Sequence, residues 1–396
     1  MHQFHTTREQ RFIDLAATLA DDFAQRAAQH DEDGSFPHEN YVRLKNSGYT
    51  IMTIPEELGG NGASLLERIK AQERLGQGCG PTALAINMHF NAVGLLIDLW
   101  RKFQDSKRAD ILRQIAAERL ICGGSASEPD NAIPVLRPRA TAERVDGGWR
   151  VSGRKIFSTQ SIALDRYFSE ALWQEGPEGE TIVSFLIPPD TPGLTFKDDW
   201  YTMGMRATAS RGTELTNVFV PASAVTLLRP AFTRGGITNL FLRAPFTIAA
   251  PYVGIAVAAR DFVVEFMRER PRFPLNKPMS HLPSVYNKVG EMDMLIETAR
   301  AMLWKAAAEA DIEEPQTWAH KSVTARTVAM ENAVRVVDLA LRAVGGASYF
   351  KRFPLERYYR DVRAALFHPV GTDQALELLG KTAFGIPMLD DDAIWA

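Results

Sequence analysis

At 396 residues the chain is long enough for about two or three domains. Its composition, with 45% hydrophobic and 23% charged residues, is that of a folded globular protein and excludes a mainly disordered one. The formal net charge of -3 and the isoelectric point near 6.3 predict no general attraction to nucleic acid or to an anionic membrane. With two cysteines, Cys79 and Cys122, and no pattern of spaced Cys and His, the sequence indicates neither a disulfide framework nor a zinc site.

The N-terminal residues run directly into a charged helical pattern, so we expect no signal peptide. No window approaches the roughly 20 apolar residues that a membrane span needs. We therefore expect a soluble cytoplasmic protein.

Residues 1–119 have the periodicity of helices. Apolar side chains recur at helical spacing from Phe12 to Leu19, and residues 81–100 are apolar enough for a helix that is buried on several sides. This pattern predicts an N-terminal helical domain.

In residues 120–232 short runs of β-forming residues alternate with turn signals. Asp-Gly-Gly at 146–148 separates two such runs, residues 140–145 and 149–152, and is typical of a β-hairpin. Further runs follow downstream, so we predict a middle domain resembling a β-barrel.

Residues 233–396 return to helical periodicity. The periodic stretches cover residues 244–268, 282–310, 318–344 and 373–384, and prolines separate the first three. Successive amphipathic helices favour a four-helix bundle. The predicted fold class is therefore α+β, mostly α, with the β domain between two helical domains.

Several short motifs add to this pattern. Residues 125–129 read SASEP, and residues 149–159 read WRVSGRKIFST. Residues 203–210 read MGMRATAS, residues 215–221 read LTNVFVP, and residues 344–363 begin VGG and end PLERYYRDVR. Together they resemble the TEP loop, the SG-x-K strand, the MG-x-R segment and the GG…RD segment of the acyl-CoA dehydrogenase family, over nearly the whole chain.

The resemblance implies a flavin cofactor, FAD or FMN. In the family the residue at the position of Ser127 contacts the pyrimidine edge of the flavin, that of Phe157 covers one face of the ring, and the hydroxyl of Thr159 reaches N5. Because N5 changes protonation in each redox cycle, a neutral hydroxyl that can donate or accept suits it. Without the resemblance, the same residues would be an ordinary turn, a buried aromatic and an edge-strand hydroxyl.

The resemblance also implies an oligomer, usually a homotetramer. Paired glycines in the family let the backbone approach the FAD pyrophosphate across a subunit interface, and Gly345 and Gly346 hold these positions. Arg270 resembles the arginine of an R-x-x-F turn that pairs with the pyrophosphate from a neighbouring subunit, since a guanidinium binds two oxygens at once. Considered alone, Arg270 would be a surface charge.

The positions that usually hold the catalytic glutamate are apolar here. Gly371-Thr372 aligns Val370 with the glutamate of the family's Y-E-G-T segment, and Leu242, directly before Arg243, occupies the alternative position. Neither side chain can accept a proton, and loss of a positioned base lowers a rate by about 10² to 10⁴. We expect Leu242, Arg243 and Val370 to shape a substrate site instead.

Within the MG-x-R segment, most residues are expected to have a structural role. Arg206 and Ser210 are the two that we expect to line the substrate side.

The motifs also resemble a branch of the family that lacks the glutamate, the two-component monooxygenases, which receive reduced flavin from a separate flavin reductase. Residues 157–160, FSTQ, resemble that branch's F-(S/C)-S-G motif, and several members have a histidine where His368 falls. In this hypothesis His368 deprotonates the substrate or helps to protonate the departing oxygen, and Ser158 or Thr159 steadies N5. The alternative for His368 is a surface or helix-capping residue. His89 is expected to be a hydrogen-bonded core histidine.

Three hypotheses remain open. The chain is a reduced-flavin-dependent monooxygenase that acts on a small organic substrate, an acyl-CoA dehydrogenase with an unrecognised base, or a non-catalytic flavin-binding or scaffold protein.

Overall fold

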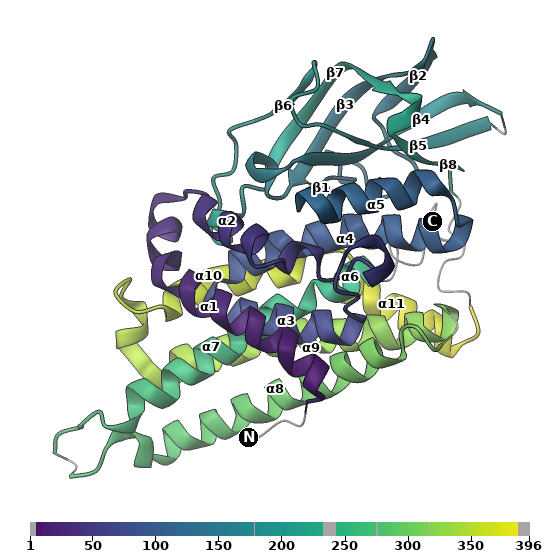
Figure 1. Cartoon of the computed structure of the whole chain (residues 1–396). Coiled ribbons are helices and arrows are strands. Elements are labelled where there is room, and N and C mark those ends of the chain that lie inside the picture. Colours follow the sequence, from purple (N-terminus) through teal and green to yellow (C-terminus); the bar gives the residue numbers. More distant parts are fainter. Residues whose placement is uncertain (1–4, 178, 233–242, 275, 314, 387–396) are drawn as a thin grey trace.

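The computed structural model describes residues 5–177, 179–232, 243–274, 276–313 and 315–386. Two helical parts lie together, and the β part lies along one side of them (Figure 1). The predicted fold class is confirmed.

The N-terminal part is entirely helical apart from loops and short 3₁₀ turns. Its helices are α1 (Thr7–Asp33), α2 (His38–Asn46), α3 (Leu65–Gly78), α4 (Gly80–Phe103) and α5 (Ser106–Glu118). The side chains of Thr6 and Ser64 each form a capping box with the glutamate three residues later, which fixes where α1 and α3 begin. These helices pack on both the β part and the C-terminal helices.

The β part is one eight-stranded sheet. Its strands are β1 (Cys122–Gly124), β2 (Thr141–Val145), β3 (Gly148–Ser158), β4 (Arg166–Gly176), β5 (Gly179–Ile187), β6 (Leu194–Phe196), β7 (Arg211–Pro221) and β8 (Val225–Pro230). They follow the order β6-β7-β3-β2-β4-β5-β8, and β1 pairs with β4. The predicted hairpin is confirmed: Val145 pairs with Gly148, and Gly147 takes a φ of +73° between them.

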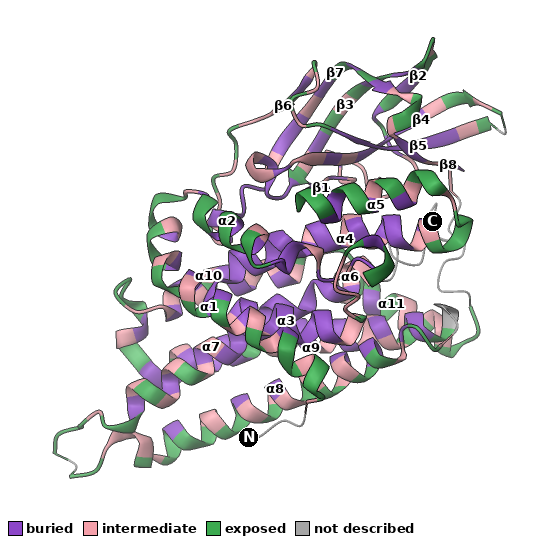
Figure 2. Ribbon diagram, in the orientation of Figure 1, coloured by how far each residue is buried: buried purple, intermediate pink, exposed green. Residues whose placement is uncertain are grey.

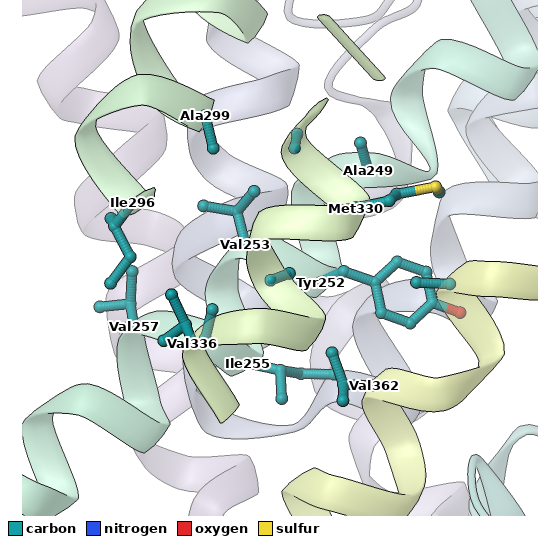
Figure 3. Close-up of a cluster of buried hydrophobic side chains, with 14 of the residues drawn as sticks. Ala249, Tyr252, Val253, Ile255, Val257, Ile296, Ala299, Met330, Val336 and Val362 are labelled. Atoms are coloured by element: carbon teal, nitrogen blue, oxygen red, sulfur yellow. The ribbon is translucent and has the colours of Figure 1, made fainter. Parts of the chain in front are cut away.

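The C-terminal part contains α6 (Ala244–Thr247), α7 (Ala249–Arg268), α8 (Pro283–Glu309), α9 (Pro315–Val344), α10 (Leu355–Val362) and α11 (Thr372–Ala383). The first three predicted helices correspond to α6–α7, α8 and α9. The fourth, α11, is short with 12 residues, and α10 was not predicted. Buried aliphatic side chains of α7, α8 and α9 form the main core, and Tyr252 lies among them with its oxygen directed away from the cluster (Figure 3).

The expectation that no segment is apolar enough to span a membrane was wrong for two helices. Residues Gly80–Phe103 and Ala244–Arg268 are each long and apolar enough to cross a membrane by length and composition. In the fold, 78% and 72% of their most apolar windows are buried inside the protein. Figure 2 shows α4 and α7 as largely buried helices of the interior, which explains their composition.

Candidate functional site

Strand β3 ends in an exposed aromatic side chain. A bulge interrupts the pairing of β3 with β7 between Lys155 and Ser158, and Phe157 takes a φ of +59° there. Such a bulge re-aims a side chain. The Phe157 ring is 57% exposed and meets the edge of Trp200, with the ring centroids 6.2 Å apart. The strand therefore presents an apolar face on which a planar ligand could stack.

Hydroxyl residues are linked to the chain on either side of Phe157. Thr159 Oγ1 lies 2.8 Å from Ser210 Oγ, which lies 2.8 Å from Thr208 Oγ1. The backbone carbonyl of Ser127 accepts from the amide of Ile156 at 3.0 Å, while the Ser127 hydroxyl makes no hydrogen bond within the described residues. Ser127 thus pairs with the residue before Phe157, Thr159 follows Phe157 by two residues and Ser210 bonds to Thr159, and we call these four residues the Phe157 platform.

Ser158 lies on the other side of the strand, because successive side chains of a strand alternate between its faces. It is fully buried, and its hydroxyl lies 2.6 Å from Thr213 Oγ1 inside the sheet. Of the two hydroxyls predicted to steady N5, the geometry favours Thr159 and gives Ser158 a structural role.

A buried ion pair joins strand β3 to the loop that follows β1. Lys155 Nζ lies 2.7 Å from Glu128 Oε1, and both side chains are almost completely buried. The Glu128 carboxylate also accepts from the backbone amides of Arg139 and Ala140, at 2.5 and 2.9 Å. Burial alone would raise the pKa of Glu128, but Lys155 and these amides outweigh it and lower that pKa. The sequence motifs contain both residues, but their pairing was not predicted.

Gln160 connects the Phe157 platform to helix α2. It is completely buried at a φ of +56°, and its Oε1 accepts from the Tyr41 hydroxyl at 2.8 Å. Its side-chain amide donates to the Cys122 carbonyl, and its backbone amide donates to the Thr208 carbonyl. This residue holds α2, β1 and the end of β3 in one arrangement.

The MG-x-R and RD motifs meet each other. Asp361 Oδ1 accepts from the amide of Met205 at 2.5 Å, and a Cβ on Gly204 would lie 2.3 Å from the carbonyl oxygen of Arg360. Only glycine permits this approach. The guanidinium of Arg206 donates to the carbonyls of Asp31 and Glu32 at the end of α1, where a cation is favourable. A place for Arg206 beside a substrate stays a prediction.

His368 lies between the C-terminal helices. Its Nε2 lies 2.7 Å from the hydroxyl of Tyr252, and its backbone carbonyl accepts from Arg326 at 2.9 Å. Arg326 also donates to the carbonyls of Val370 and Pro245. Burial, with a smaller contribution from Arg326, lowers the pKa of His368 to about 4, so its imidazole is neutral at pH 7. His368 is half-buried and stands at the C-cap position of the 3₁₀ helix Arg363–Phe367, while its ring bonds to Tyr252.

Among the described residues, no carboxylate forms a hydrogen bond or ion pair with His368 or Val370. Leu242 lies outside the described residues. Arg243 lies at the start of α6 and forms ion pairs with Asp98 at 3.6 Å and Asp311 at 2.7 Å.

Arg270 follows α7 and the paired glycines follow α9, and we treat them as a second region. The connection between α7 and α8 lies at the end of these helices far from the β part (Figure 1). The Arg270 guanidinium lies 4.5 Å from the ring of Phe266, which in turn contacts Phe353 behind the glycine turn. Arg270 Nη1 is buried and has no hydrogen-bond partner. Gly345 takes a φ of +70°, and a Cβ on either Gly345 or Gly346 would point into open space. This region therefore has an unused donor and accessible backbone.

His89 is the core histidine that the sequence indicated. Its Nε2 lies 2.7 Å from the Thr50 carbonyl, so that nitrogen carries the proton, and its Nδ1 accepts from the Cys122 amide at 2.9 Å. Burial lowers its pKa to about 4. Both ring nitrogens are occupied, so this histidine is structural.

Comparison with protein families matches the whole arrangement. The N-terminal, middle and C-terminal domains of acyl-CoA dehydrogenases match residues 6–118, 124–218 and 246–372. The chain is 35% identical over 384 residues to the putative acyl-CoA dehydrogenase YdbM of Bacillus subtilis, covering 95% of this chain and 97% of that protein. It is 28% identical over 386 residues to the benzylmalonyl-CoA dehydrogenase of Aromatoleum aromaticum, covering 95% and 98%.

Solved structures agree with this match. KijD3 in complex with FMN and a dTDP-linked amino sugar superposes with a TM-score of 0.85 at 26% identity, covering 97% of this chain and 96% of that one. A nitrososynthase from Micromonospora carbonacea gives 0.83 at 27% identity, covering 96% and 98%. Butyryl-CoA dehydrogenase from Megasphaera elsdenii gives 0.86 at 24% identity, covering 97% and 100%, and shows the shared fold.

Proposed function

Because the chain belongs to the acyl-CoA dehydrogenase family, we propose that it is a flavin-dependent oxidoreductase, and specifically a monooxygenase that uses reduced flavin. One observation carries the proposal: Val370 stands where the family's base is expected, and no described carboxylate contacts it or His368. A dehydrogenase of this family must remove a thioester α-proton, which needs a positioned base. Oxygenation by reduced flavin does not require that step.

The residues fit a flavin. The exposed ring of Phe157 can cover a planar face, and Thr159 and Ser127 offer hydroxyls at its edge. The unpartnered Arg270 Nη1 and the open backbone at Gly345 and Gly346 suit a pyrophosphate. Bound flavin would supply two-electron redox chemistry and, when reduced, reaction with oxygen. FAD uses both regions, whereas FMN needs only the first.

The two regions lie apart in one chain, which supports an oligomer. We propose a homotetramer in which Arg270 and the paired glycines complete the flavin site of a neighbouring copy. A separate reductase would supply reduced flavin, and a cytoplasmic location suits such a pair of proteins.

His368 is the residue that we place beside the substrate. Since its pKa lies near 4, it is a weak base, and its neutral ring acts by hydrogen bonding. Tyr252 fixes the orientation of the ring through Nε2, and Arg326 holds its backbone. We propose that His368 orients the substrate or stabilises a developing negative oxygen, while Phe157 and Val370 help to exclude water.

An anaerobic titration tests the proposal. We expect the purified protein to bind reduced flavin more tightly than oxidised flavin, and butyryl-CoA to leave the absorbance of the oxidised complex unchanged. Val370→Glu would restore a carboxylate and should permit bleaching, whereas Val370→Gln, of the same size, should not. Rapid bleaching of the wild-type complex would contradict the proposal.

An acyl-CoA dehydrogenase with an unrecognised base is the second candidate. It is favoured by the relatives, since the Bacillus subtilis and Aromatoleum aromaticum proteins are named as dehydrogenases. This candidate predicts bleaching by an acyl-CoA in the wild type. A non-catalytic member would bind flavin in neither redox state.

A further inference from the structure

Arg68 on α3 is a buried cation. Its side chain is 4% exposed, and all of its hydrogen bonds leave from one nitrogen, Nη2. The acceptors are the carbonyl and Oδ1 of Asn87, Oδ1 of Asn91 and Oγ1 of Thr247, at 2.6 to 3.2 Å. Nε is buried and has no hydrogen-bond partner within the part of the chain that the structure describes. Neutral oxygens therefore hold the guanidinium in place and leave part of it unused.

No carboxylate compensates this charge among the described residues. Burial lowers the pKa of Arg68 to about 9, and the nearby cation Arg243 adds to the lowering. A buried charge without a partner is unfavourable, and proteins normally pair it or leave it to a ligand. Arg326 shows the ordinary solution without a carboxylate: its Nε, Nη1 and Nη2 each donate to a backbone carbonyl.

Arg68 lines a cavity of about 240 Å³. The walls include Phe90 and Ile97, which contribute apolar surface, and Gly94 of α4. Three arginines and two aspartates contribute to the lining, so its formal charge is positive. The two aspartates, Asp98 and Asp311, both pair with Arg243. Arg68 is left as the buried positive group of an otherwise balanced cavity.

The hydrogen bonds of Arg68 connect this cavity to the proposed substrate site through α6. The Thr247 hydroxyl of α6 accepts from Arg68, and the Pro245 carbonyl of the same helix accepts from Arg326. Arg326 also donates to the carbonyls of His368 and Val370. An anion bound to Arg68 is therefore linked through α6 to the backbone of His368 and Val370.

We propose that this cavity binds a small organic anion whose carboxylate or similarly charged group pairs with Arg68, while its apolar part packs against Phe90 and Ile97. A guanidinium in an apolar pocket recognises such a group by charge-assisted hydrogen bonds. The identification of this anion as the substrate rests on the proposed function. Its binding in this cavity is independent of that function.

Ligand-induced thermal stabilisation of the full-length protein tests the binding separately from any redox activity. The probes are butyrate and its neutral isostere butyramide. Butyrate should raise the melting temperature in a saturable way, and butyramide should not. Equal stabilisation by the two would overturn the proposal, and this comparison requires no variant.

Two variants locate the site. Arg68→Gln should weaken butyrate binding at least tenfold, whereas Arg101→Gln, which removes an exposed arginine at the rim of the same cavity, should change it less than threefold. Undiminished binding by R68Q, or an equal loss in R101Q, would contradict the assignment.

The C-terminal carboxylates provide a further control. Residues 390–392 are all aspartates and lie outside the described residues. Replacing them by asparagine should leave the butyrate affinity unchanged. A rise in affinity would identify them as the counter-ion of Arg68 and overturn the proposal.

Discussion

Lys155 and Arg68 are both buried cations, but their surroundings differ. Lys155 lies 2.7 Å from the carboxylate of Glu128, which two backbone amides also satisfy. Arg68 has only neutral acceptors and lines a cavity. The charge of Lys155 is compensated within the fold, whereas the charge of Arg68 has no carboxylate partner among the described residues. Lys155 supports the segments around the Phe157 platform, and Arg68 is the residue that we assign to a ligand.

Breaking the compensated pair should have the largest effect. Lys155→Met leaves Glu128 buried without its cation, and we expect a loss of about 3–5 kcal/mol in the free energy of unfolding. The double variant E128Q/K155M should recover part of this loss. Urea denaturation measures both, and a K155M protein as stable as the wild type would show that the pair does not hold the loops.

Acid should create a new uncompensated cation at His89. Its pKa in the folded protein is about 4, below the ordinary value near 6.5. Above pH 6.5 neither state is protonated; as the pH falls from 6.5 to 4, only the unfolded chain takes up the proton, and stability is lost. The loss reaches about 3 kcal/mol. His89→Gln should flatten the pH dependence of the melting temperature in this window, and an unchanged slope would contradict the assignment.

Removing Arg68 should change the free energy of unfolding in the opposite direction to removing Lys155. Arg68→Met deletes a charge without a carboxylate partner, so the free energy of unfolding should stay the same or rise by up to about 2 kcal/mol. The same denaturation measurement applies. A loss as large as that of K155M would mean that Arg68 has a counter-ion within the protein.

The smallest effects concern two neighbouring hydroxyls. Ser158→Ala should cost about 1 kcal/mol of stability, because it removes a buried hydrogen bond to Thr213, and should leave flavin affinity unchanged. Thr159→Ala should cost a similar amount of stability, because it removes the hydrogen bond to Ser210, and should also weaken flavin binding several-fold. Fluorescence titration with flavin distinguishes them, and the reverse pattern would restore the predicted role of Ser158.

Much of the fold and part of the site could be predicted from the sequence. Local patterns identified the helices, the hairpin at Gly147 and the motif that presents Phe157. The sequence did not predict strand β4, because the charged residue Glu170 makes the segment resemble a surface loop. In the fold Glu170 is buried and forms an ion pair with Arg229 on β8. Motif spacing likewise gave no sign that Glu128 and Lys155 would meet.

Arg68 was missed for a related reason. On α3 it stands among other charged residues and resembles part of a solvated face. Its burial arises from α4 and α6, which pack over it from distant parts of the chain. For Arg206 the fold shows contacts that the family motif did not indicate, with the two carbonyls at the end of α1.

We propose that this protein uses reduced flavin and oxygen without a carboxylate base. Mixing the anaerobic, reduced protein–flavin complex with oxygen in a stopped-flow spectrometer tests it most directly. We predict a transient absorbing species, distinct from both reduced and oxidised flavin, that decays to oxidised flavin. Direct conversion to oxidised flavin with no transient, together with rapid anaerobic reduction by an acyl-CoA, would contradict the account.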